Sequence, residues 1–354
     1  MPSQPPLPPL LAPYVSTLPD SSLTLVSSIL GATSNWLVLR FLHAALSSQS
    51  GSHATFGRDE LQNGIKKKVV LVSFMRSYEF WRTEAKRLGL DLARLADKQR
   101  FAFIDGLSEL FYAPQSTATA TATATPTRTP AALASSPRTN LPMRSAPGTV
   151  PGRAPPPTAP APAVGGNTTQ VRAEPGIAKK LHFSGRGLAS LDALENDISS
   201  VIEQQKASME EGDELILIID QPDLLLAATG PSMGIGATEM AEWITGLQQH
   251  AHATILTLAT DAPLIHNAST SGGQLATPIE TEHAALAIGL AHRARSVMQL
   301  RTLETGAAKD VSGVLRISRG GVLNTSEDNG LEEREALYYI QRDGGVTVFG
   351  RGES

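Results

Sequence analysis

The feature that most constrains the fold is a strand, a tight turn and a helix within residues 23–46. Apolar residues at 23–26 predict a short strand, and a helix is expected from about Asn35 to the end of this stretch. Thr33 and Ser34 are suited to cap that helix. A phosphate-binding P-loop is built from these parts, because the helix N-terminus directs unpaired N–H groups at an anion.

The charged part of a P-loop is missing from this turn. The motif G-x-x-x-x-G-K-[ST] requires a lysine, but the first lysine of the chain is Lys66. Losing one electrostatic clamp typically costs about 3–4 kcal/mol of transition-state stabilisation, so we expect no efficient hydrolysis by this chain alone. We expect no cofactor of its own, with weak or shared ATP binding left open. The degenerate nucleotide site would comprise Ser27, Ser28, Gly31, Thr33 and Ser34.

Composition narrows the class of protein. The chain has 354 residues, 41% of them hydrophobic, which is enough for a sizeable core. It has no cysteine, which excludes disulfides and thiolate chemistry, and its scattered histidines predict no metal site. The net charge of −4 gives no general attraction to nucleic acid. We expect a soluble intracellular protein, since neither a signal peptide nor a membrane-spanning apolar run is apparent.

The order of elements predicts an α/β fold in two parts. A proline-rich lead, 1–20, is expected to be flexible, and 21–112 alternates between strands and helices in the manner of a parallel sheet. The segment 113–178 is rich in Pro, Ala and Thr and has no aromatic residue, so we predict a disordered insertion. The fold resumes over 179–354, whose last strands alternate like antiparallel ones.

The strongest strand signal, Glu214–Asp220, ends in a carboxylate. An apolar strand ending in Asp is the Walker-B pattern, in which the carboxylate reaches a magnesium ion. We therefore add Asp220 to the degenerate nucleotide site, and keep open that it only caps a neighbouring turn. Asp105 also ends a strand, and would be a general base in an active relative.

A polar loop follows the strand at 253–259 and precedes a capping box at Thr277. In hexameric ATPases of this architecture, loops at this position line the central channel and meet nucleic acid. Loop 224–238 is a companion candidate, and the basic helix end 292–295 a further possible RNA contact. The residues proposed to contact nucleic acid are His266, Asn267, Ser269, Thr270 and Gln274, which also suit any exposed loop.

The run VVLVSFMRSYEFWRTEAKRLGLDL, residues 69–92, resembles the signature of the Elongator complex subunit six family. The pattern S-F-x-R-S-x-x-F-W, with Arg76, Phe80 and Trp81, carries the resemblance together with R-L-G-L-D-L. The other elements follow the order of that family over most of the ordered chain. The insertion at 113–178 departs from it, so nothing functional is carried onto that segment.

The resemblance implies a RecA-like three-layer fold that has lost its Walker motifs. Family members form a hetero-hexameric ring with Elongator subunits four and five, two copies of each. The ring docks on the catalytic Elongator core, binds tRNA and supports wobble-uridine modification in the cytoplasm and nucleus. A subunit of this kind is a non-catalytic scaffold with no membrane contact.

Two other classes remain open from the sequence. One is an active RecA-like ATPase acting on DNA, which the order of elements favours and the missing lysine opposes. The other is an adaptor that presents proline-rich segments to peptide-recognition domains.

Overall fold

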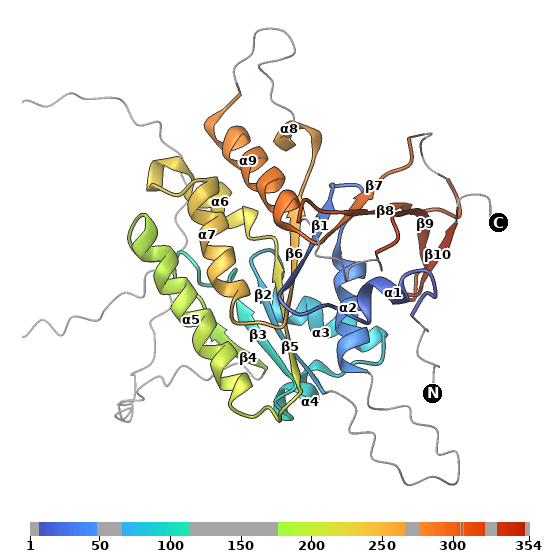
Figure 1. The fold of residues 1–354 in the computed structure, drawn as a ribbon, viewed down its shortest axis with the longest axis horizontal. Helices are drawn as coiled ribbons and strands as arrows, with labels where there is room; N and C mark the ends of the chain where they lie inside the picture. The colour runs from blue at the N-terminus through green and yellow to red at the C-terminus, as the bar shows by residue number, and fades with distance from the viewer. Residues whose placement is uncertain are drawn as a thin grey trace, which may run out of the picture. The chain divides into compact units, whose positions relative to one another are not determined.

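The computed structural model describes residues 7–47, 66–112, 176–265, 276–304, 306, 308–322 and 331–350. Within these residues the chain forms one sheet of 10 strands with helices on both faces (Figure 1). The predicted three-layer α/β fold, mostly parallel with antiparallel C-terminal strands, is therefore confirmed.

The strands follow the chain in order. They are β1 (Ser22–Ser28), β2 (Lys67–Ser73), β3 (Phe101–Asp105), β4 (Ile177–Lys180), β5 (Glu214–Asp220), β6 (Ala253–Ala259), β7 (Ser296–Arg301), β8 (Gly313–Arg319), β9 (Arg334–Ile340) and β10 (Val346–Gly350). Their order in the sheet is β10-β9-β8-β7-β1-β6-β5-β2-β3-β4. Neighbours from β7 to β4 are parallel, and those from β10 to β7 are antiparallel.

The helices divide between the two faces of the sheet. They are α1 (Ala12–Val15), α2 (Asn35–Leu46), α3 (Tyr78–Arg87), α4 (Leu92–Asp97), α5 (Leu188–Lys206), α6 (Asp223–Thr229), a 3-10 turn (Pro231–Met233), α7 (Ala237–Gln248), α8 (Ala262–Ile265) and α9 (Pro278–Arg293). Helices α1 to α4 pack on one face, and α5, α6, α7 and α9 on the other.

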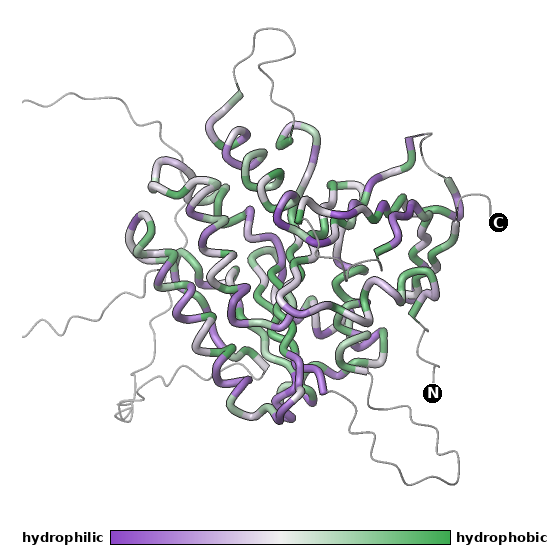
Figure 2. The backbone as a smooth tube through the Cα atoms, viewed as in Figure 1, coloured by the Kyte–Doolittle hydropathy of each residue, from purple (hydrophilic) through white to green (hydrophobic). Residues whose placement is uncertain are grey.

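The two faces follow from alternation along buried strands. Val69 and Leu71 of β2 belong to the core under α2 and α3, whereas Val70 and Val72 belong to the core under α5 and α7. A strand buried on both faces reads as a continuous apolar run, which is why β2 and β5 were evident from sequence. Figure 2 shows this apolar centre as green strands between helices of mixed colour.

Several boundaries agree with the sequence prediction. Helix α2 spans Asn35–Leu46, as expected, and β5 ends at Asp220. Helix α9 opens with the predicted capping box, in which Thr277 Oγ1 accepts the Glu280 N–H at 3.3 Å and Glu280 Oε2 accepts the Thr277 N–H at 2.7 Å. The turn between β9 and β10 has Gly344 at φ +88°, a conformation that favours glycine.

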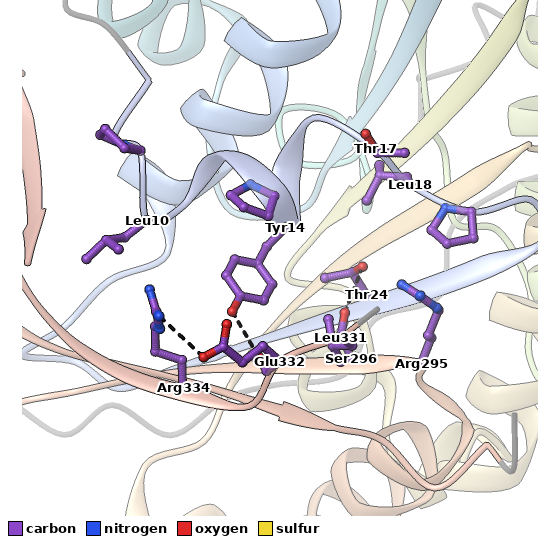
Figure 3. Close-up of a pocket in the computed structure, with 13 residues that line it drawn as sticks. Leu10, Tyr14, Thr17, Leu18, Thr24, Arg295, Ser296, Leu331, Glu332 and Arg334 are labelled. Atoms are coloured by element: carbon purple, nitrogen blue, oxygen red, sulfur yellow. Dashed lines mark hydrogen bonds and ion pairs between the residues drawn. The ribbon is translucent and has the colours of Figure 1, made fainter. Parts of the chain in front are cut away.

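Part of the proline-rich lead 1–20 packs against the fold over the residues that the structure describes. Leu11 is 0% exposed and Tyr14 8% exposed. The Tyr14 hydroxyl donates to the Glu332 carbonyl oxygen at 2.8 Å, a contact visible in Figure 3. The physical reason is that apolar side chains between the prolines bury surface, while proline loses little conformational freedom on ordering.

Several short elements were missed in the sequence, among them β4, α4 and α6. Strand β4 begins at Ile177, within the predicted insertion 113–178, of which 113–175 lie outside the described residues. It is short and polar because it lies at the edge of the sheet. Helix α4 was also missed, and α6 occupies part of the loop predicted at 224–238. All three are too short to show a full period of apolar residues.

Candidate functional site

The carboxyl ends of the parallel strands meet at one edge of the sheet, where the predicted nucleotide-site residues fall. Ser28 at the end of β1 is in register with Ala259 of β6. Asp220 at the end of β5 is in register with Thr257 of β6 on one side and with Ser73 of β2 on the other. The positions that Walker A and Walker B motifs would occupy therefore share one edge, with β6 between them.

The turn between β1 and α2 is closed by its own hydrogen bonds. The Ala32 N–H donates to the Ile29 carbonyl oxygen at 2.9 Å, and the Leu30 N–H donates to Asp261 Oδ1 at 3.0 Å. A Cβ added at Gly31 would lie 2.8 Å from the Thr302 side chain, so the turn lies close to the segment that follows β7. Two backbone donors that a P-loop would direct at phosphate are thus already used.

The predicted hydroxyl groups do not converge on this turn. Ser27 and Ser28 belong to β1 itself, rather than to the turn, and both are buried. Ser34 is the N-cap of α2, but its helical backbone conformation keeps its hydroxyl from accepting an amide hydrogen, so the expected cap bond is not made. Its Oγ is buried without a described partner, and Thr33 is exposed.

Asp220 is held by a buried network. Its side chain is 0% exposed. Oδ1 accepts the Thr257 hydroxyl at 3.0 Å, and Oδ2 accepts the Ser73 hydroxyl at 2.8 Å. The Arg76 guanidinium lies at 3.4 Å from Oδ2 and 3.5 Å from Oδ1. Both carboxylate oxygens therefore have donors from β2, from β6 and from the turn after β2.

Arg76 supplies the charge that balances Asp220. Its backbone N–H donates to the Ser73 hydroxyl at 3.0 Å, and its guanidinium lies over the Phe80 ring at 5.4 Å from the centroid. Burial raises the pKa of Asp220, while Arg76 and the two hydroxyl donors oppose that rise. An internal cation thus occupies the place where a Walker-B carboxylate would meet a metal ion.

This ion pair was not predicted, although both of its members were named. The sequence singled out Arg76 within the S-F-x-R pattern and Asp220 at the end of β5, but gave no reason to join them. The signal lies in the topology, because a residue just after β2 reaches the end of β5 only if those strands are neighbours.

Asp105 caps a turn rather than facing a reaction centre. Its Oδ1 accepts the Leu107 and Ser108 N–H groups, both at 2.9 Å. A second unpredicted polar pair joins α6 to α9, where His283 Nε2 lies 3.4 Å from Asp223 Oδ2. Such pairs fix neighbouring elements and place no open acid or base at the edge.

A pocket of about 310 Å³ lies where the N-terminal lead meets β1, β7 and the approach to β9. Figure 3 shows Tyr14 directed at Glu332, with Arg334 beside it and Arg295 at the other end. Arg334 pairs with Glu332 at 3.3 Å. Of the basic segment 292–295, Arg295 lines this pocket, and its contact with RNA stays a prediction.

The tRNA-binding residues that we predicted, His266, Asn267, Ser269, Thr270 and Gln274, lie outside the described residues. Among the residues that the structure does describe, no cluster of His, Cys, Asp or Glu could hold a metal ion. No helix within the same ranges is both long and apolar enough to cross a membrane.

The comparisons with known proteins agree in part with the sequence resemblance. No family model matches the chain. The chain is similar to Elongator complex protein 6 of Xenopus laevis, with 29% identity over 141 residues. That match covers 39% of this chain and 46% of the frog protein, so the chain spans less than half the length of this relative.

Proposed function

We propose that this chain is a non-catalytic subunit of an Elongator-type complex. It would assemble with subunits four and five into a hetero-hexameric ring containing two copies of each. That ring would dock on the catalytic Elongator core and bind tRNA in support of wobble-uridine modification. The proposed location is the cytoplasm and the nucleus, as for the family that residues 69–92 resemble.

The Asp220–Arg76 ion pair carries the non-catalytic part of this proposal. A carboxylate that already accepts from Ser73, Thr257 and Arg76 would have to lose a buried partner before it could bind magnesium. The closed turn after β1 gives the same indication at the Walker-A position. ATP bound by the ring would then be held mainly by a neighbouring subunit.

The similarity to Elongator complex protein 6 supports the choice of complex. Co-expression with Elongator subunits four and five, followed by native mass spectrometry, tests it. We expect a hexamer holding two copies of each subunit. A free monomer, or a homo-oligomer that binds neither partner, would contradict the proposal. The active RecA-like ATPase would then be the favoured alternative.

A turnover assay on the isolated chain separates the scaffold from that alternative. We expect no steady ATP hydrolysis, with or without DNA. Hydrolysis that is lost in Asp220→Ala, but kept in the exposed control Asp310→Ala, would favour the ATPase.

The tRNA-binding loop is a separate part of the proposal. Replacing 264–274 by a short glycine linker should weaken tRNA binding by the assembled ring and leave assembly intact. An electrophoretic mobility assay on rings of confirmed composition measures this. Unchanged tRNA affinity would show that the loop makes no contact.

A further inference from the structure

A groove of about 290 Å³ lies between α2, α3 and the β9–β10 hairpin. We name it the Arg40 groove, after the residue at its floor. Its walls are mainly apolar, and they comprise Trp36, Leu39, Phe80, Leu88 and Ile340. It lies on the α2 and α3 side of the sheet and is separate from the pocket of Figure 3. Its wall residue Phe80 also contacts Arg76 of the Asp220 cluster.

Arg40 is a buried charge with almost no internal compensation. Its side chain is 1% exposed, and only Nη2 has a partner in the described structure, the Gly344 carbonyl oxygen at 3.0 Å. Nε and Nη1 are buried and have no described acceptor. A guanidinium has five N–H donors, and buried charges in proteins are normally paired.

The other polar groups of the groove do not neutralise this cation. Glu84 lines the groove, but its carboxylate pairs with Arg87 at 3.0 Å. Asn35 adds a buried Oδ1 atom that has no described donor. The groove therefore offers one uncompensated cation, one free acceptor and the unpartnered Trp36 Nε1 donor between apolar walls.

This combination selects the chemistry of a ligand. A carboxylate fits a guanidinium through two parallel hydrogen bonds. The part of the ligand next to that carboxylate would be apolar, because it would contact Trp36 and Phe80. A phosphate dianion would keep an unbalanced charge, because among the described residues lining the groove only Arg40 is a cation. Ile340, at 37% exposure, extends the apolar wall to the surface.

We propose that the Arg40 groove is a docking site for an acidic peptide segment of a partner protein. An Asp or Glu carboxylate of the segment pairs with Arg40, and a neighbouring apolar side chain packs between Trp36 and Phe80. Because Arg40 is held beneath the hairpin turn through Gly344, docking moves that turn enough to admit the carboxylate. The proposal does not depend on which complex the chain joins.

The test begins with selection of a randomised peptide library on the full chain. We expect enriched peptides that carry Asp or Glu next to an aromatic or aliphatic residue. An enriched peptide is then compared with its amide counterpart, in which Asn or Gln replaces the acid, by fluorescence anisotropy. The amide form should bind about tenfold more weakly, since a charge-assisted bond is lost.

Variants assign the binding to the groove. Arg40→Met should weaken the acidic peptide by about tenfold or more. Ile340→Asp changes only an exposed wall residue, so it keeps the fold and should also weaken binding, by charge repulsion. Its matched control is Ile288→Asp on α9, where an isoleucine is 49% exposed, and this variant should bind as the unchanged chain does.

Four outcomes would overturn the proposal. Selection could give no acidic motif, or the enriched peptide could bind equally to Arg40→Met and Ile340→Asp. Inorganic phosphate could instead shift the Arg40 Nε–H resonance while acidic peptides leave it unchanged, which would make this a small-anion site. Self-association that sedimentation detects in the unchanged chain and not in Arg40→Met would identify a second copy as the occupant.

Discussion

Two buried charges of this molecule differ in how far the groups around them compensate their charge. Asp220, at the carboxyl edge of the sheet, has a cation and two hydroxyl donors around it. Arg40, beneath the β9–β10 hairpin, has a single backbone acceptor. Both side chains are nearly inaccessible to water, at 0% and 1% exposure, so the difference lies in their partners and not in their burial.

The comparison indicates which site is complete within one chain. A buried charge costs several kcal/mol unless charged or hydrogen-bonding partners offset its lost hydration. At Asp220 that compensation is internal, so this edge of the sheet holds a structural cluster. At Arg40 it is largely missing among the described residues, which is the arrangement expected of a group that is completed by a ligand.

The largest effect is expected from removing the carboxylate of the complete site. Asp220→Ala leaves Arg76 beside an apolar gap, and should lower the free energy of unfolding by about 3 kcal/mol. Urea denaturation followed by circular dichroism measures this. The exposed control Asp310→Ala should stay within about 0.5 kcal/mol. If Asp220→Ala also lowered the free energy of unfolding by no more than about 0.5 kcal/mol, the cluster would contribute nothing to stability.

Removing the cation from the same cluster should have a smaller effect that depends on pH. Arg76→Met should cost about 2 kcal/mol at neutral pH, because Asp220 can take up a proton. Without Arg76 the folded-state pKa of Asp220 rises further above the unfolded value, so the folded state holds the extra proton and stability falls as pH rises from the usual aspartate range toward neutral.

Urea denaturation across that pH range, compared with the unchanged chain, gives the measurement. The matched control is Arg82→Met, because Arg82 forms an exposed pair with Glu79 on α3. A constant difference between Arg76→Met and the unchanged chain at every pH would show that Asp220 does not titrate.

Removing the charge at Arg40 should instead raise the free energy of unfolding. Arg40→Met removes an uncompensated charge and keeps much of the side-chain volume, so the free energy of unfolding should rise by about 1 kcal/mol at neutral pH. Arg316→Met, at an exposed position of β8, serves as the control and should be neutral. Destabilisation of Arg40→Met beyond about 1 kcal/mol would mean that Arg40 is already satisfied within the chain.

The smallest effect is a change in a histidine titration. His43 lies on α2 near Arg40, and burial lowers its pKa, with Arg40 lowering it further. Its contribution to stability is therefore present above the usual histidine range and is lost as pH falls through it. Arg40→Met should raise the pKa of His43, which NMR of the ring protons measures. An unchanged pKa would indicate that Arg40 carries no charge in the folded protein.

Local patterns in the sequence gave much of the fold. Helix α2 and strands β3, β5 and β6 were placed within a residue or so, because each is a run of apolar or periodic residues long enough to be recognised. The lead, β4 and α6 were not, since each is short and gains its stability from packing against distant elements. The predicted site residues Ser27, Ser28 and Asp220 were found at one edge, but not in a phosphate-binding arrangement.

The sequence by itself determined that the chain alternates strands and helices, ends in antiparallel strands and lacks the lysine of a P-loop. These properties depend on residue type and on spacing along the chain. Only the tertiary structure decided that Arg76 would neutralise Asp220 and that Arg40 would be buried without a counter-charge. Those outcomes depend on which strands and helices become neighbours, because the energy of a charge is set by the groups around it in space.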